Sequence, residues 1–181
     1  MAAPGDVALV LHTHLPYVRN HGVWPVGEQW LFEAWGQAWL PTTQLLLTLA
    51  EEGHRDVLTL AVTPVAAHQV ADRRLRRDLG TWLASQMWQS EEQRLAYDGP
   101  DHDAVRSLAP FHWRHFARLL EIHERVEAAG GLLAVWADLQ GAGVIELLAG
   151  PATHPYLPLL ADPTLVDAQL ASGLASHAIW A

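Results

Sequence analysis

The sequence contains no cysteine and no lysine, and each absence excludes a kind of chemistry. Without cysteine the chain forms no disulfide, no thiolate zinc site and no cysteine nucleophile. All 11 basic residues are arginine, so no lysine can form a Schiff base. The 20 acidic residues give a net charge of −9, which disfavours nucleic acid as a partner.

Long hydrophobic runs and common nucleotide or hydrolase motifs are also lacking. No stretch approaches the roughly 18 consecutive apolar residues of a membrane span, so no membrane partner is expected. The N-terminus has neither a basic region nor a cleavage site typical of a signal peptide, and a cytoplasmic location is predicted. No glycine-rich phosphate loop and no Gly-x-Ser-x-Gly motif are found.

Hydrophobic residues, tryptophan and histidine are plentiful. Half of the 181 residues are hydrophobic and 17% are charged, which favours a folded domain. The chain has nine tryptophans and 11 histidines. Indole rings stack on the apolar face of sugars, so this composition suits a sugar site, although aromatic residues at helical spacing are more often core.

Short apolar runs alternate with helical patterns along the chain. Such alternation implies right-handed parallel crossovers, so we predict an α/β fold with three parallel strands and helical insertions. Three strands cannot close a barrel, which makes this an incomplete barrel with exposed strand edges. We see no linker that divides the chain. The predicted strands are 7–11, 57–62 and 144–149, and the predicted helices are 28–49, 64–97, 103–129, 132–140 and 163–180.

Three prolines bear on the helix boundaries. Thr63-Pro64 is typical of a helix N-cap followed by proline at the first helical position. Pro41 either kinks its helix or starts a second one, and Pro110 is expected to break a helix.

The pair His12 and His14 directly follows the first apolar run. That run suits a strand buried on both faces, and side chains two residues apart point to the same side of it. Ligands bind at the carboxyl ends of parallel strands, so the two imidazoles could bind a polar ligand or a metal. The alternative is that one or both satisfy backbone groups in a buried turn.

Glu146 lies inside the third apolar run, and His154 follows the same run. A buried carboxylate needs a partner, so Glu146 is expected to point into a polar barrel interior; the alternative is a solvated residue on an edge strand. His154 could meet His12 and His14 at the mouth of a pocket.

Other charged residues are interpreted as surface groups. Glu28 and Glu33 are five residues apart and do not share a helix face, so both are assigned to the surface or a helix end. Four arginines between positions 73 and 77 could bind an anion, but a solvated helix face is favoured. His112, His115 and His123 lie on one helix, where a metal role is disfavoured.

Five stretches, in this order along the chain, resemble the N-terminal part of glycoside hydrolase family 57, closest to its 1,4-α-glucan branching enzymes. They are His-Thr-His-Leu-Pro-Tyr-Val-Arg at 12–19, Trp-Leu-Phe-Glu-Ala at 30–34 with Leu-Pro at 40–41, Leu-Thr-Leu at 58–60 with Thr-Pro at 63–64, Gly-Val-Ile-Glu-Leu-Leu at 143–148, and Ala-Thr-His-Pro-Tyr-Leu-Pro-Leu-Leu at 152–160. One departure is Pro155, where a glycine would be more usual.

The resemblance implies a seven-stranded β/α barrel that performs retaining α-glucan transfer without metal or other cofactor. It implies that residues 1–181 are the N-terminal part of the catalytic barrel, truncated before the strand of the nucleophilic glutamate. The catalytic glutamate and aspartate would then lie outside the chain, which we expect to be inactive alone. The implied partners are an α-glucan and the missing C-terminal part of the enzyme. The implied substrate-binding residues are His12, His14, Glu146, His154 and Trp24.

Two other functions fit the residues less well. His12, His14 and His154 could hold zinc in a metal-dependent carbohydrate deacetylase, but no aspartate stands beside the two N-terminal histidines to act as base. Alternatively, the chain is a non-catalytic glucan-binding remnant that uses Trp24, Trp30 and the histidines. In either case the unpaired strand edges predict a poorly soluble or oligomeric protein.

Overall fold

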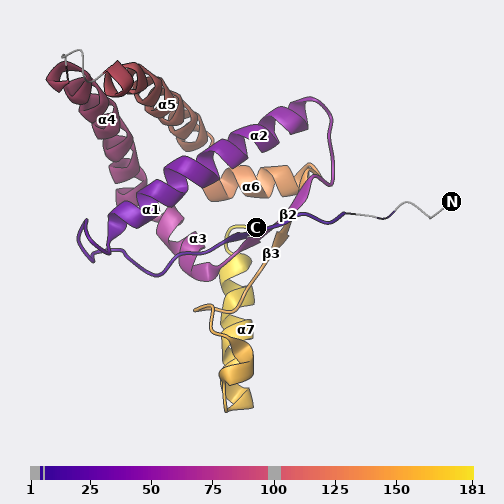
Figure 1. Cartoon of the computed structure of the whole chain (residues 1–181). Coiled ribbons are helices and arrows are strands. Elements are labelled where there is room, and N and C mark those ends of the chain that lie inside the picture. The colour runs from indigo at the N-terminus through magenta and orange to yellow at the C-terminus, as the bar shows by residue number, and fades with distance from the viewer. Residues whose placement is uncertain (1–4, 6, 98–102) are drawn as a thin grey trace. The chain divides into compact units, whose positions relative to one another are not determined.

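The computed structural model describes residue 5 and residues 7–97 and 103–181, and Figure 1 shows the course of the chain. Its elements are β1 (Val10–Thr13), α1 (Glu28–Ala34), the π-helix η1 (Trp35–Trp39), α2 (Leu40–Glu51), β2 (Leu58–Val62), α3 (Pro64–Ala71), α4 (Arg73–Ala96), α5 (Asp103–Ala128), α6 (Leu132–Gly141), β3 (Ile145–Leu148), the 3₁₀ turn η3 (Leu157–Leu159) and α7 (Pro163–His177). None of the described helices combines the length and the apolarity needed to cross a membrane.

The chain divides into two compact units. The first comprises residues 1–17, 45–71 and 132–181, and the second comprises residues 18–44 and 72–131. The chain passes from one unit to the other at 17/18, 44/45, 71/72 and 131/132. Because the division is discontinuous in sequence, no single linker marks it.

The first unit contains a sheet of three parallel strands in the order β1-β2-β3. The predicted α/β fold with three parallel strands is therefore confirmed, and the sheet is open. In the register, His12 of β1 lies opposite Ala61 of β2, and Thr59 of β2 lies opposite Glu146 of β3. β1 begins later than predicted and includes His12, so His14 stands immediately after the strand.

The two faces of this sheet differ in burial. Leu60, Val62 and Leu147 alternate onto one face and are buried. On the opposite face, Val10 is 55% exposed and Leu148 is also exposed. The prediction that the first strand is buried on both faces was wrong, because β1 lies at the edge and the described chain covers one face only.

Helices α3 and α6 pack in the first unit, with α6 beside β3. The predicted start of α3 is confirmed: Pro64 is its first residue, and the amide of Ala66 donates to Thr63 Oγ1 at 3.3 Å. After α2, Gly53 has φ +87°, a left-handed conformation that ends a helix at little cost for glycine.

The second unit consists mainly of the helical pair α4 and α5, which pack along each other (Figure 1). Leu75, Leu79 and Leu83 repeat every four residues on α4 and are fully buried. Pro110 lies inside α5 and does not break it, contrary to expectation. The rest of this 26-residue helix and its packing against α4 outweigh the roughly 3 kcal/mol cost of an internal proline.

The second unit also holds the first helical segments. α1, η1 and the start of α2 follow one another without a break. Pro41 is the second residue of α2, so it stands at the start of a helix, directly after the π-helical segment. Proline lacks the amide proton that a continuous α-helix would use there, and a π-bulge is one way to absorb that loss.

Candidate functional site

Three imidazoles meet at the carboxyl end of the sheet. His12 lies within β1, His14 follows the strand, and His154 lies in the turn after β3 with φ +54°. The ring centroid of His154 is 4.7 Å from that of His12 and 4.3 Å from that of His14, and the His12 and His14 centroids are 6.1 Å apart. The prediction that these histidines come together is confirmed; their role in substrate binding stays a prediction.

The hydrogen bonds restrict where the protons lie. His12 Nε2 and His154 Nε2 are 3.2 Å apart, so one nitrogen donates a proton and the other accepts it. The Thr63 hydroxyl lies 3.2 Å from the carbonyl oxygen of Thr13, to which it donates. Having no second proton, it must accept the hydrogen bond from His14 Nδ1 at 3.1 Å. Neutral His14 therefore carries its proton on Nδ1 and leaves Nε2 as an acceptor.

The electrostatics favour neutral rings for His12 and His14. Partial burial lowers the pKa of His12, and a charge on His154 would lower it further. The pKa of His14 is lowered for the same reasons, with His12 as an additional repelling group. Neutral imidazoles offer both donors and acceptors, which is what hydroxyl-rich ligands require.

Glu146 does not belong to this cluster. It lies exposed on β3, where Thr59 Oγ1 donates to its Oε2 at 2.9 Å. Glu146 and His12 lie on the same exposed face of the sheet. His12 is level with Leu148, so Glu146 is two residues, or roughly 7 Å, nearer the amino ends of the strands, and it is two strands, or roughly 10 Å, to the side. There it lines an open hollow of about 250 Å³ near the amino ends of the strands.

The expected burial of Glu146 was therefore wrong for the described chain. Ile145 and Leu147 alternate onto the covered face, which puts Glu146 on the other side of an edge strand. The solvated alternative fits this position, with Thr59 as the partner of the carboxylate.

Trp24 lies in the second unit. It stands in the loop before α1, and its residue is 77% exposed. An exposed indole is available for stacking on a ligand. Trp35 of the same unit is fully buried and belongs to the core.

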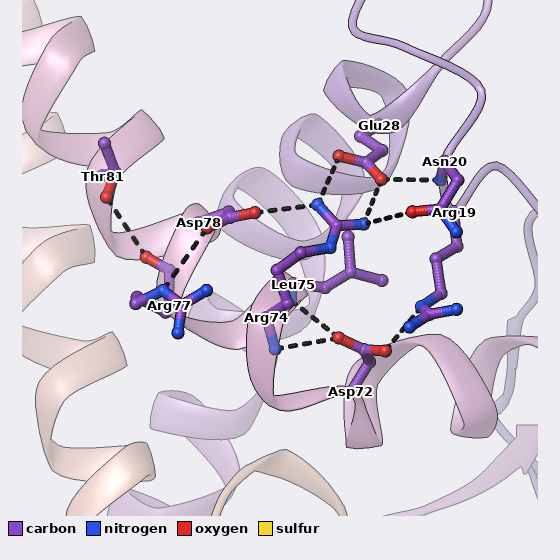
Figure 2. Close-up of polar contacts among 9 residues, drawn as sticks. All are labelled: Arg19, Asn20, Glu28, Asp72, Arg74, Leu75, Arg77, Asp78 and Thr81. Atoms are coloured by element: carbon purple, nitrogen blue, oxygen red, sulfur yellow. Dashed lines mark hydrogen bonds and ion pairs between the residues drawn. The ribbon is translucent and has the colours of Figure 1, made fainter.

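The sequence interpretation missed two features of the second unit, both shown in Figure 2. Glu28, assigned to the surface, is only 8% exposed and forms an ion pair with Arg74. The arginine cluster, assigned to a solvated face, splits: Arg74 pairs with Glu28 and Asp78, whereas Arg77 is largely solvated. The start of α4 could have been located from Asp72, which stands three residues before the leucine-rich face. Asp72 is the N-cap of this helix, and its side chain accepts hydrogen bonds from the amides of Arg74 and Leu75.

Arg76 makes a separate ion pair with Glu127, at 2.8 Å. This pair joins α4 to α5, so Arg76 too was wrongly assigned to a solvated face.

The zinc hypothesis gains no support from the geometry. Within residues 7–97 and 103–181, no group of three or more histidine or acidic side chains is arranged to hold a metal ion. The near approach of His12 Nε2 and His154 Nε2 is accounted for by a shared proton.

Comparisons with known proteins bear on the fold and the family. The model of the family described as Glycosyl hydrolase family 57 matches residues 8–175. A Mycobacterium tuberculosis protein named "Probable 1,4-alpha-glucan branching enzyme" is 38% identical over 182 residues, which cover 95% of this chain and 34% of that protein.

Two solved structures are also similar. The branching enzyme of Pyrococcus horikoshii matches with a TM-score of 0.87 and 33% identity, over 96% of this chain and 32% of that one. The branching enzyme of Thermococcus kodakaraensis, solved in complex with glucose and additives, matches with a TM-score of 0.81 and 32% identity, over 94% of this chain and 30% of that one. The chain thus spans about a third of the length of these relatives, and the resemblance read from the sequence is confirmed.

Proposed function

The chain belongs to glycosyl hydrolase family 57, and from this premise we propose that it is the N-terminal part of a 1,4-α-glucan branching enzyme and supplies part of the donor-sugar site. The observation that carries the proposal is the cluster of His12, His14 and His154 at the carboxyl end of the parallel sheet. That end is where ligands bind in barrels and open α/β sheets.

The cluster suits a glucosyl unit because each sugar hydroxyl is both a donor and an acceptor. Thr63 holds the proton of His14 on Nδ1, so His14 Nε2 can accept from a hydroxyl. His12 and His154 share one proton between their Nε2 atoms, and a hydroxyl could insert between them as donor to one and acceptor from the other. Such contacts orient the sugar but do not cleave its glycosidic bond.

The chemistry of a retaining branching enzyme needs two carboxylates. The first carboxylate attacks the anomeric carbon while the second, as an acid, protonates the departing oxygen. The second carboxylate then acts as a base and takes the proton of the acceptor's 6-hydroxyl, whose oxygen attacks the anomeric carbon and releases the first carboxylate. We place both carboxylates outside residues 1–181, in the remaining part of the enzyme. Glu146, paired with Thr59, and Trp24 are assigned to sugar contacts or their support, not to bond cleavage.

In the described chain β1 and β3 are the edges of the sheet and one sheet face is uncovered; the edges support the further proposal that the remaining strands of the barrel pair there. Val10 and Leu148 project from that face without cover in the described chain. An α-glucan and the remaining part of the enzyme are thus the proposed partners, and we propose that the chain alone forms no α-1,6 branches.

Calorimetry with maltoheptaose tests the sugar site. We expect binding by the wild-type chain and about tenfold weaker binding by His14→Ala, since one lost hydrogen bond costs about 1–1.5 kcal/mol. His54→Ala, which removes an exposed histidine of the same unit, should bind like the wild type. Absence of binding by the wild type, or equal binding by both variants, would contradict the proposal. New α-1,6 linkages formed from amylose by the chain alone would overturn the placement of the catalytic carboxylates.

A further inference from the structure

The loop between Val18 and Glu28 in the second unit is closed by its own backbone. The amide of His21 donates to Val18 O at 3.0 Å, and the amide of Glu28 donates to Gly22 O at 2.9 Å. A Cβ on Gly27 would lie 2.3 Å from that same Gly22 oxygen, so only glycine permits this approach. Gly22, inside the loop, is therefore in contact with Gly27 and Glu28 at its C-terminal end.

Glu28 joins both ends of this loop to α4. Its Oε1 accepts from the amide of Asn20 at 2.8 Å and from Arg74 Nη2, and its Oε2 accepts from Arg74 Nη1 at 3.0 Å (Figure 2). The hydrogen bond from the Arg74 side chain is the main cause that lowers the pKa of Glu28, and the Asn20 amide adds to it. The carboxylate is thus ionised and bound by two N–H groups of one guanidinium, the strong bidentate form of this pair.

The partners of Arg74 extend the same attachment. Its Nη2 donates to Asn20 Oδ1 at 3.3 Å, and its Nη1 donates to Asp78 Oδ2 at 2.9 Å. Beside it, Arg19 Nε lies 2.6 Å from Asp72 Oδ2. Figure 2 shows these residues around the first turn of α4, so the base of the loop is tied there by charged groups.

At the tip of the loop, three apolar side chains are mostly exposed. Val23 is 61% exposed, Trp24 77% and Val26 52%. Their side chains bury too little surface to hold the loop in place by apolar packing. The polar contacts at the base therefore help to set the position of the Trp24 indole, together with the hydrogen bond from the Gln29 amide to Val23 O at 3.3 Å.

We propose that Glu28 and Arg74 are a positioning pair that fixes the loop 20–27 and thereby sets where Trp24 presents its indole to an α-glucan chain. The glucan part of this inference rests on the proposed function; the attachment of the loop does not. Neither Glu28 nor Arg74 is assigned a contact with sugar.

Hydrogen exchange of the full chain tests the attachment. Glu28→Gln keeps the shape of the side chain and removes its charge, and Arg74→Lys keeps the charge and removes the fork. We expect exchange of the Asn20, His21 and Glu28 amides to rise at least tenfold in Glu28→Gln and to a lesser degree in Arg74→Lys. The matched control is Glu127→Gln, which breaks the α4–α5 ion pair with Arg76 and should leave these amides unchanged. Unchanged exchange in a folded Glu28→Gln variant would overturn the proposal.

Binding of maltoheptaose tests the consequence for Trp24. Glu28→Gln should weaken binding about three- to tenfold in the wild-type background but not in a Trp24→Ala background, because Glu28 acts through that indole. A merely structural role would weaken binding equally in both backgrounds, and that result would overturn the positioning of Trp24. If the wild type binds no glucan at all, the proposed function fails, while the exchange result still decides whether the pair holds the loop.

Discussion

The histidine cluster of the first unit and the Glu28–Arg74 network of the second are built from opposite kinds of group. In the cluster, the pKa values of His12 and His14 are lowered, the rings are partly open to solvent, and a hydrogen bond joins the Nε2 atoms of His12 and His154. The network uses a carboxylate and a guanidinium that remain ionised, with the carboxylate almost fully buried. The first arrangement suits reversible binding of a ligand, whereas the second suits a permanent structural contact between segments of the chain.

Removing the Glu28 side chain should have the largest effect on stability. Glu28→Ala leaves the Arg74 guanidinium without its main partner, and we expect a loss of about 1–3 kcal/mol in the free energy of unfolding; the partial exposure of Arg74 keeps the loss below that of a fully buried pair. Urea denaturation measures this loss. Glu91→Ala breaks the exposed Arg94–Glu91 pair on the same helix and serves as the control, with no comparable loss expected. Equal losses of unfolding free energy in Glu28→Ala and Glu91→Ala would show that the buried Glu28–Arg74 pair is no more stabilising than an exposed pair.

Substitution of Thr63 should have the next largest effect on stability, and it tests the histidine cluster in the same way. Thr63→Val removes the hydroxyl that caps α3 and orients His14, at an expected cost of about 1 kcal/mol in unfolding free energy. The ¹⁵N shifts of the His14 ring should move from one fixed tautomer to a mixture. Thr63→Ser retains the hydroxyl and should retain both properties. A single His14 tautomer in Thr63→Val would mean that another group orients the ring.

The sequence predicted those parts of the molecule that depend on local pattern. Three apolar runs became three parallel strands, and Thr63-Pro64 became the start of α3. The proximity of His12, His14 and His154 could be predicted because the carboxyl ends of parallel strands meet at one edge of a sheet. These inferences need only the order of elements and the alternation of side chains.

The remaining features depend on partners far away in the chain. Glu28 was placed on the surface because its partner Arg74 lies 46 residues later and on another helix. The exposure of Glu146 and Val10 depends on which face of the sheet the helices cover, and an apolar run does not specify this. Trp24 lies in a different unit from the histidines, and a discontinuous division leaves no signal in local composition. Its role in substrate binding stays a prediction.

The smallest expected effect on stability is that of acid pH, which should weaken the two regions in different ranges of pH. The folded-state pKa values of His12 and His14 lie below their ordinary value, so the unfolded chain binds more protons; their contribution to stability is complete above about pH 6.5 and is lost as the pH falls below it. Glu28 also has a lowered pKa, but its contribution is complete above about pH 4.5 and is lost only below that. Stability should therefore fall in two separate ranges of pH.

Urea denaturation from pH 8 to pH 3 measures both ranges, and single variants assign them. His14→Gln should reduce the slope that begins at about pH 6.5 and leave unchanged the further loss that begins at about pH 4.5. The buried His123, whose pKa is lowered by burial, contributes to the upper range as well, so part of the slope should persist in that variant. Glu28→Gln should reduce only the slope below pH 4.5. If His14→Gln altered the slope above pH 6.5 instead, the folded-state pKa of His14 would be raised and not lowered, and the contrast between a neutral imidazole and a charged framework would be lost.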